Sequence, residues 1–201
     1  MNRFTAIAVS ALMTAAGAAA AEDKKAEAPP MTAEQQAQMA AFEKASTPRA
    51  EHQQLAYFVG NWTTKTQVWM DPKEPAMESP GTSKGEIVYG GRYVSMTYVG
   101  TFWGQPFNGY GLLGFDNLRG KFFNTWVDSM TTGFWLAWGE YDKSSNAWTF
   151  LGEMPDMMKP STMIKVRQVI RIFDQNHYGF DWYEFRDGKE TRTMNIDYRR
   201  Q

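Results

Sequence analysis

Apolar and polar residues alternate along most of this chain, in short segments separated by polar turns. The segments that fit β-strands are 61–69, 82–89, 92–102, 106–115, 121–130, 133–141, 147–153, 162–173, 177–186 and 190–199. Turn sequences such as Asp116–Gly120 and the dipeptide Asp187-Gly188 separate them, and Asp-Gly favours a tight hairpin. The links are too short for crossover helices, which parallel strands would need. The pattern therefore predicts an all-β fold, an antiparallel up-and-down β-barrel of about ten strands preceded by short helices.

The alternation also predicts which side chains share a face of each strand. In the last strand, Met194, Ile196 and Tyr198 lie on one face, and polar residues lie on the other. Strands 121–130 and 133–141 carry large apolar residues on both faces. One of these faces is expected inside the barrel, and the other is expected under the N-terminal helices or against a second subunit. A homodimer is one expectation from this pattern.

The first residues have the order of a secretory signal peptide. Arg3 is followed by an apolar run from Phe4 to about Ala16 and then by small residues, so residues 1–21 are predicted to be removed on export. The apolar run is too short to span a membrane. The mature protein is therefore expected in the periplasm or outside the cell.

Two helices are predicted before the strands. Residues 22–46 fit a charged linker followed by a loosely attached helix, which Thr32 and Gln35 begin with a capping box. Residues 47–201 fit the barrel domain with a leading helix, for which Thr47 is the expected N-cap and Pro48 the first helical residue. Leu55 and Phe58 share one face of that helix.

Composition removes several classes of function. The chain has 0 cysteines, which excludes thiol catalysis and cysteine-ligated metals. The formal charge of -1 becomes -2 without Arg3, and such a nearly neutral chain is not expected to bind nucleic acid. Aromatic residues make up 15% of the sequence, and this much ring surface needs a core, a ligand cavity or a partner. The strands of an outer-membrane barrel also alternate between apolar and polar residues. Two features do not favour that class here: the chain ends in Arg200-Gln201 rather than in an aromatic residue, and helices precede the strands.

The candidate site residues come from the aromatic strands and from the few charged residues near them. Asp128 lies between aromatic neighbours, where it is expected to act either as an anchor for a ligand head group or as a structural clamp at a strand end. Its candidate polar partners are Arg167, Glu153, Asn124 and Glu140. The predicted ligand-binding set is Trp126, Asp128, Phe134, Trp138, Glu153, Arg167 and Trp182.

Part of the sequence resembles a known bacterial family. A helix with His52 and Leu55, then Gly60-Asn61-Trp62, and then Trp126-Val127-Asp128-Ser129-Met130 resemble the pattern of the family called domain of unknown function 1579. The same pattern continues with Glu153, Pro155 and Arg167, and it covers about His52 to Arg200. The resemblance implies a lipocalin-like, calycin-type barrel in an exported protein, and it implies no agreed activity.

A looser resemblance is to nitrobindin-like barrels, which hold haem through a histidine late in the chain. His177 is the one candidate at such a place, but the turn sequence around it favours an exposed histidine. No cofactor is therefore expected. With only His52 and His177 present, no metal site is expected either. Ser129 lacks a nucleophile elbow, and catalysis on two carboxylates has no supporting spacing, so an enzyme is not favoured.

Two functions fit these observations. The first is a lipocalin-like carrier of a small hydrophobic or amphipathic molecule. The alternative is a structural module with a packed core that associates with itself through its second aromatic face. The sequence does not decide between a hollow and a filled barrel.

Overall fold

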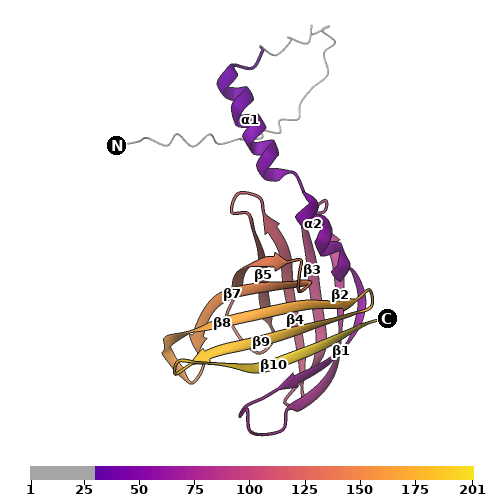
Figure 1. Cartoon of the computed structure of the whole chain (residues 1–201), viewed down its shortest axis with the longest axis vertical. Helices are drawn as coiled ribbons and strands as arrows, with labels where there is room; N and C mark the ends of the chain where they lie inside the picture. The colour runs from indigo at the N-terminus through magenta and orange to yellow at the C-terminus, as the bar shows by residue number, and fades with distance from the viewer. Residues whose placement is uncertain (1–29) are drawn as a thin grey trace, which may run out of the picture. The chain divides into compact units, whose positions relative to one another are not determined.

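The computed structural model describes residues 30–201, and Figure 1 shows its course. The chain divides into two compact units, Met1–Gln38 and Met39–Gln201. The predicted signal peptide, residues 1–21, and most of the predicted linker lie outside the described residues. The second unit holds the whole barrel and the short helices that lead into it.

Helix α1 (Ala33–Ser46) begins with the predicted capping box. The backbone N–H of Thr32 donates to Oε1 of Gln35 over 2.9 Å, and the backbone N–H of Gln35 donates to Oγ1 of Thr32 over 3.2 Å. These two bonds satisfy donors that the first turn of a helix leaves without partners. None of the residues of α1 is buried, so the helix depends on local propensity and capping.

The leading helix is shorter than predicted and begins later. It consists of α2 (Ala50–Gln54) and a 3₁₀ turn, η1 (Leu55–Phe58). Thr47 is not its cap, because its hydroxyl donates to the carbonyl of Glu43 at the end of α1, over 2.7 Å. His52 takes the capping role instead: its Nδ1 accepts the backbone N–H of Arg49 over 3.0 Å. Burial lowers the pKa of His52, which keeps this acceptor nitrogen unprotonated.

Ten strands form the barrel within the described residues, which confirms the predicted fold class. They are β1 (Gly60–Val68), β2 (Met77–Val88), β3 (Tyr93–Phe102), β4 (Gln105–Asp116), β5 (Lys121–Asp128), β6 (Trp135–Asp142), β7 (Ala147–Asp156), β8 (Lys159–Asp174), β9 (His177–Arg186) and β10 (Lys189–Arg200). Each strand pairs antiparallel with the next, and β1 pairs with β10 to close the barrel. Closure leaves no sheet edge free for aggregation.

Two predicted loops are partly strand. The proline-containing stretch before residue 81 enters β2 at Met77, and Pro80 pairs with Lys65. The interval between the predicted strands 147–153 and 162–173 is reduced to a two-residue turn between β7 and β8, and the ladder is irregular at Pro155. Proline lacks a ladder donor and is tolerated at such irregularities, so the long strands that a closed barrel needs continue through it.

The up-and-down topology gives the barrel two different ends. The connections 89–92, 117–120, 143–146 and 175–176 lie at the end where α2 and η1 enter, which we call the closed end. The connections 69–76, 103–104, 129–134, 157–158 and 187–188 lie at the other end, which we call the open end. In Figure 1 the β1–β2 connection lies at the bottom and the turns after β7 and β9 lie at the left, away from α2.

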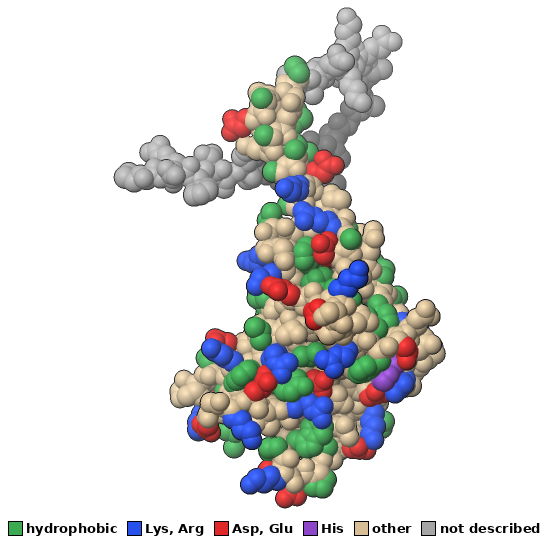
Figure 2. Space-filling model, viewed as in Figure 1, with side chains coloured by type: hydrophobic (Ala, Val, Ile, Leu, Met, Phe, Trp, Pro, Cys, Tyr) green, Lys and Arg blue, Asp and Glu red, His purple; other side chains and the backbone are tan. Residues whose placement is uncertain are grey.

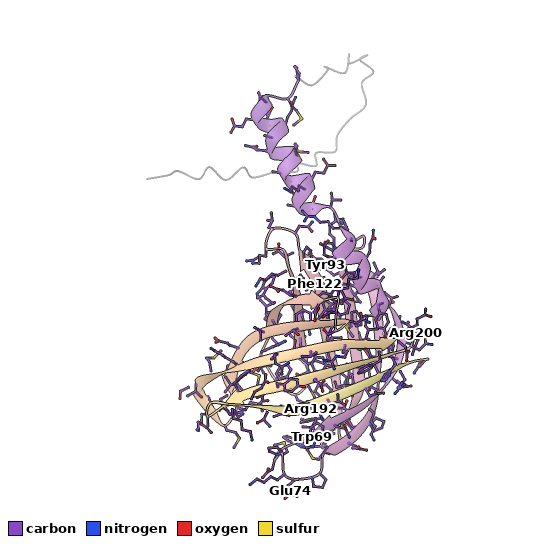
Figure 3. All side chains as sticks on the ribbon, in the orientation of Figure 1. Trp69, Glu74, Tyr93, Phe122, Arg192 and Arg200 are labelled. Atoms are coloured by element: carbon purple, nitrogen blue, oxygen red, sulfur yellow. The ribbon has the colours of Figure 1, made fainter. Side chains whose placement is uncertain are left out.

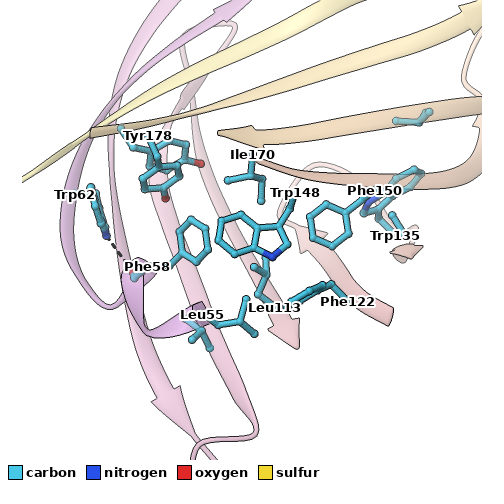
Figure 4. Close-up of a cluster of buried hydrophobic side chains, with 14 of the residues drawn as sticks. Leu55, Phe58, Trp62, Leu113, Phe122, Trp135, Trp148, Phe150, Ile170 and Tyr178 are labelled. Carbon is cyan, nitrogen blue, oxygen red and sulfur yellow. Dashed lines mark hydrogen bonds between the residues drawn. The ribbon is translucent and has the colours of Figure 1, made fainter. Parts of the chain in front are cut away.

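A buried aromatic core fills the closed end (Figure 4). Phe58 and Trp62 are 0% exposed, and Trp148 and Tyr178 are 1% exposed. The indole Nε1 of Trp62 donates to the carbonyl of Phe58 over 3.1 Å, which joins η1 to the first strand. Burial of each such side chain contributes about 1.5–3 kcal/mol. The 3₁₀ turn therefore acts as an apolar plug in the barrel.

The outer surface is mixed in character. On the barrel face shown in Figure 2, positive, negative and apolar side chains are interspersed. This agrees with the formal net charge of -1. Among residues 30–201, we find no helix with both the length and the apolar character needed to cross a membrane.

Candidate functional site

The inner face of the open half carries aromatic residues that remain partly exposed. Trp126 of β5 pairs with Trp135 of β6, and Trp182 of β9 pairs with Gln168 of β8, so all four share the inner face. Trp126 and Trp182 are only half-buried, whereas an inward residue of the closed half such as Trp148 is almost completely buried. The rings of Trp126 and Trp182 are therefore partly accessible, although they belong to the inner face.

Two glycines on β4 leave space for the indole ring of Trp126. A side chain at Gly109 would put its Cβ 1.9 Å from Cζ2 of Trp126, so the ring lies directly over this residue. Gly111 is also close: its Cβ would be 3.1 Å from Cε3 of the same indole. The small residues of β4 thus let a large ring lie flat against the inner wall of the barrel.

A polar bridge crosses the interior between strands that are not neighbours. Nδ2 of Asn124 on β5 donates to Oε1 of Gln168 on β8 over 3.1 Å. Gln168 is 2% exposed, so this amide needs the bond to offset its burial. Trp135 lies in the same region, 7% exposed, and its Nε1 has no hydrogen-bond partner among the described residues. The middle of the barrel therefore has a buried donor available.

A cluster of charged side chains lies at the open end of the inner face. Nη1 of Arg186 donates to Oδ2 of Asp156 over 2.5 Å, and its Nε donates to Oε2 of Glu184 over 2.8 Å. Oε1 of Glu184 accepts Nε1 of Trp182 and Oγ1 of Thr193, each over 3.2 Å. We call Asp156, Glu184, Arg186, Trp182 and Thr193 the mouth cluster. Three strands, β7, β9 and β10, contribute to it.

A hydrogen bond between Asp156 and Arg186 favours the charged form of both side chains. The hydrogen bond from Arg186 lowers the pKa of Asp156, and the same bond raises the pKa of Arg186. The side chain of Asp156 is 7% exposed and that of Glu184 is 14% exposed, while that of Arg186 is 37% exposed. The carboxylates are therefore shielded, and the guanidinium lies between them and solvent. An Arg has five N–H donors, so the two bonds leave further donors for another molecule.

The structure places the predicted aromatic residues on both sides of the barrel wall. Trp126 and Trp182 lie inside. Trp138 packs outside on Phe123, with ring centroids 5.7 Å apart, and Phe134 is 68% exposed in the β5–β6 connection. The predicted face of β6 is thus corrected, because its pairing with β5 turns Trp135 inward. Both faces of β6 are apolar, so alternation alone did not identify the inner one.

Asp128 occupies the strand-end position that one reading of the sequence predicted. Its Oδ1 accepts the backbone N–H groups of Met130 and Thr131, each over 2.9 Å. These bonds shape the start of the β5–β6 connection, as aspartate often does in turns. Asp128 is on the inner face, where Gly109 of β4 is its partner. It is therefore a clamp beside the open end, and no bond joins it to the mouth cluster.

Glu153 and Arg167 do not join Asp128. Arg167 lies on the outer face, where Nε and Nη2 donate to the carboxylate of Glu190 over 2.6 and 2.8 Å. Its guanidinium also lies over the ring of Tyr183, 4.0 Å from the centroid. Glu153 is exposed and alternates with inward residues of β7. The predicted polar network is therefore corrected: Arg167 belongs to an outer ion pair, and the inner network is the mouth cluster.

The two histidines have structural partners. His177 begins β9 on the outer face, where Nε2 lies 2.5 Å from Oδ2 of Asp197 and the ring packs on Phe173. It does not point into the interior, where a haem ligand would be needed. His52 caps α2. Among residues 30–201 there is no group of three His, Asp or Glu side chains arranged to hold a metal ion.

The sequence contained a signal for part of the mouth cluster. Trp182, Glu184 and Arg186 are spaced two apart in a predicted strand, so they had to share a face. Trp182 was selected, but the two charged residues next to it on that face were not. Asp156 was assigned to a loop and had no such signal, because proline and methionine surround it.

Comparison with solved structures supports the fold. The crystal structure of Rv2717c from M. tuberculosis aligns with a TM-score of 0.53 at 14% identity, covering 77% of this chain and 99% of that chain. The S-type phycobiliprotein lyase CPES from Guillardia theta aligns with a TM-score of 0.51 at 11% identity, covering 80% of this chain and 97% of that chain. A de novo designed fluorescence-activating β-barrel aligns with a TM-score of 0.41 at 13% identity, covering 73% and 96%.

The two matches with TM-scores above 0.5 show a shared barrel fold and nothing further. No curated protein matches the chain. The likeness to nitrobindin-like barrels is not confirmed by these matches and stays a prediction. The resemblance seen in the motifs around Trp62 and Trp126 is confirmed, because a family model matches nearly the whole barrel unit. With residues 47–200 matched, the chain belongs to the family described as "Protein of unknown function (DUF1579)".

Proposed function

We propose that this protein binds a small amphipathic molecule inside the open half of its barrel. The observation that carries the proposal is the inner wall itself, where the rings of Trp126 and Trp182 remain partly exposed and Trp182 donates a hydrogen bond to the mouth cluster. Aromatic walls with a few fixed polar groups are typical of small-molecule sites. The closed half is packed, so the ligand enters and leaves through the open end.

The apolar part of the ligand fits the aromatic region deeper in the barrel. The ring centroids of Trp135 and Trp182 are 4.8 Å apart, and those of Phe180 and Trp182 are 6.4 Å apart. Nε1 of Trp135 would donate to an oxygen on the ligand, which supports an ester, ether or carbonyl group at this depth.

The polar end of the ligand fits beside Arg186. Two carboxylates already compensate the guanidinium, so a strongly anionic head group would gain little there. The remaining N–H donors of Arg186 suit an uncharged acceptor such as a hydroxyl or carbonyl oxygen. The proposed ligand is therefore a neutral amphipathic molecule.

We also propose that the protein acts after export, in the periplasm or outside the cell, as the signal-like residues 1–21 suggest. Sequencing the N-terminus of the protein recovered from the periplasm tests this. A mature chain that still begins at Met1 would contradict it.

The alternative is a self-association module, and exposed apolar residues on the outer face favour it. Tyr110 and Val127 pair across β4 and β5 and are 44% and 40% exposed, and Leu151 on β7 is 60% exposed. Analytical ultracentrifugation decides this point. A monomer at every concentration would remove the homodimer.

Trp126 and Trp138 offer a matched pair for testing the carrier function. Both lie on adjacent strands, β5 and β6, but only Trp126 faces the interior. We expect the chain to bind the neutral fluorescent probe N-phenyl-1-naphthylamine saturably, and Trp126→Ala to weaken this binding about tenfold, since one ring contact is worth about 1 kcal/mol or more. Trp138→Ala should leave the affinity unchanged. Circular dichroism confirms that both variants are folded. Absence of saturable binding, or equal losses in both variants, would count against the proposal.

A further inference from the structure

The connections at the open end expose an unusual amount of apolar surface. Four of the five carry large exposed apolar side chains. They are Met70 (70% exposed), Trp103 (55%), Met130 (44%), Phe134 (68%), Met157 (71%) and Met158 (83%). We call these six residues the apolar rim. Figure 3 shows Glu74 at the tip of the β1–β2 connection, with Trp69 and Arg192 at its base, far from Arg200 at the closed end.

The closed end differs in both apolar and charged residues. In its four connections only Tyr89 (74% exposed) and Leu118 (82%) are large, apolar and exposed among the described residues. Its charged residues are all basic: Arg92, Arg119 and Lys143. The open-end connections carry three acidic residues, Asp71, Glu74 and Asp187, and one basic residue, Lys73. The apolar rim is thus a property of one end of the barrel, and the connections at that end carry more acidic than basic residues.

We propose that the apolar rim docks on an uncharged or zwitterionic lipid surface, from which the barrel takes up its ligand. This inference rests on the proposed function. A poorly soluble amphipathic molecule resides in membranes, and the apolar rim surrounds the entrance through which the molecule would pass. Methionine, phenylalanine and tryptophan on separate turns can each enter the head-group region, where tryptophan is particularly favoured. The negative balance of the connections argues against an anionic surface.

The arrangement of the apolar rim favours lipid over a protein partner. Its residues come from four connections, and Asp71, Thr131 and similar polar residues lie between them. A protein interface needs a contiguous, well-packed patch, whereas separated apolar tips suit a fluid lipid surface that adapts to each of them. Two of the tips, Trp103 and the pair Met157–Met158, lie in two-residue turns that project from the strand ends.

Trp103 and Tyr89 allow a closely matched test. Each begins a hairpin turn with a positive φ, 49° for Trp103 and 51° for Tyr89, and each is exposed. Asparagine adopts this backbone conformation more readily than an aromatic residue does, so Trp103→Asn and Tyr89→Asn should both preserve or improve folding. Trp103→Asn alters the open end of the barrel, whereas Tyr89→Asn alters the closed end.

The assay is flotation of the purified chain with phosphatidylcholine vesicles. We expect binding that does not depend on salt, and we expect Trp103→Asn combined with Met158→Ser to weaken it about tenfold or more, because two apolar tips are removed. Tyr89→Asn should bind as the parent does. All variants have the same N-terminal segment, so a difference in vesicle binding between them is due to the apolar rim. Absence of binding, binding that requires anionic lipid, or equal losses in the two variants would overturn the proposal.

A second readout separates this inference from the carrier function. Uptake of N-phenyl-1-naphthylamine from aqueous solution, without vesicles, should be unchanged in Trp103→Asn with Met158→Ser. If vesicle binding is absent while probe uptake persists, the docking inference is wrong and the carrier function stands. If the apolar rim instead mediates dimerisation, the double variant would change the sedimentation mass without any vesicle binding, which would also refute lipid docking.

Discussion

Arg200, the second-last residue, is expected to hold the apolar plug in the barrel. Its Nη1 donates to the carbonyl of Val59 over 2.7 Å, and its Nη2 donates to the carbonyl of Tyr57 over 2.9 Å. Its guanidinium also lies over the indole of Trp62, 4.1 Å from the ring centroid. The last strand is thereby joined to η1 and to the first strand at once.

The contribution of Arg200 to the free energy of unfolding can be worked out from these contacts. Each partly buried bond from a charged donor is worth about 1.5 kcal/mol, and the stacking on Trp62 adds about 1 kcal/mol. Arg200→Ala should therefore lower the free energy of unfolding by about 4 kcal/mol, which corresponds to roughly 10 °C in Tm for a domain of this size. Arg200→Lys should lose about half as much, because an ammonium cannot donate to both carbonyls in the same planar geometry.

Chemical denaturation followed by tryptophan fluorescence measures these differences. Arg199→Ala is the matched control: its side chain is 58% exposed and bonds only Asp197, so it should cost about 1 kcal/mol or less. If Arg200→Ala costs no more than Arg199→Ala, the plug is held by apolar packing alone and the reasoning is wrong.

Two other predictions concern the packing around the same plug. Burial lowers the pKa of His52 below its ordinary value of 6.5. The stabilisation that neutral His52 provides is therefore fully present above pH 6.5, and it is lost as the pH falls through the lower pKa of the folded state. Stability should decrease as the pH falls below 6.5, and this slope should be smaller in His52→Asn, as denaturation at a series of pH values would reveal; an unchanged slope would show that His52 is not responsible. A Cβ at Gly85 would lie 2.1 Å from the backbone oxygen of Phe58, so Gly85→Ala should destabilise by about 2 kcal/mol. Gly133, with nothing within 4 Å, is the control, and its alanine variant should change stability by less than about 0.5 kcal/mol in the same thermal melts.

The barrel could be predicted because its signal is repeated in every strand. Alternation, short polar turns and Asp187-Gly188 all indicate antiparallel hairpins, and no segment favours a crossover helix. The strand ends near Pro80 and Pro155 were less predictable. Local propensity there favours loops, and only pairing with both neighbours in the closed barrel extends the strands through them.

The site was harder to predict than the fold, for a reason that β6 illustrates. Its two faces carry Trp135 and Trp138, and a one-residue change of phase exchanges the inside with the outside. Pairing with β5 determines which face of β6 points inward, and the alternation within β6 alone does not reveal this pairing. Arg167 was misplaced for a similar reason: its partner Glu190 lies 23 residues away on a strand that is not adjacent to it in the barrel.

The mouth cluster bears on the choice between the two candidate functions. Shielding Asp156 and Glu184 from water is costly, and even a well-paired buried charge cluster is often no more stable than apolar residues of the same size. The closed half shows that this chain can fill barrel interior with Phe58, Trp148 and Tyr178. A module that needed only a stable core could have been filled in the same way throughout. The open half instead keeps partly exposed rings beside fixed charges, and this arrangement has a physical advantage if a polar group of another molecule must be held at the entrance.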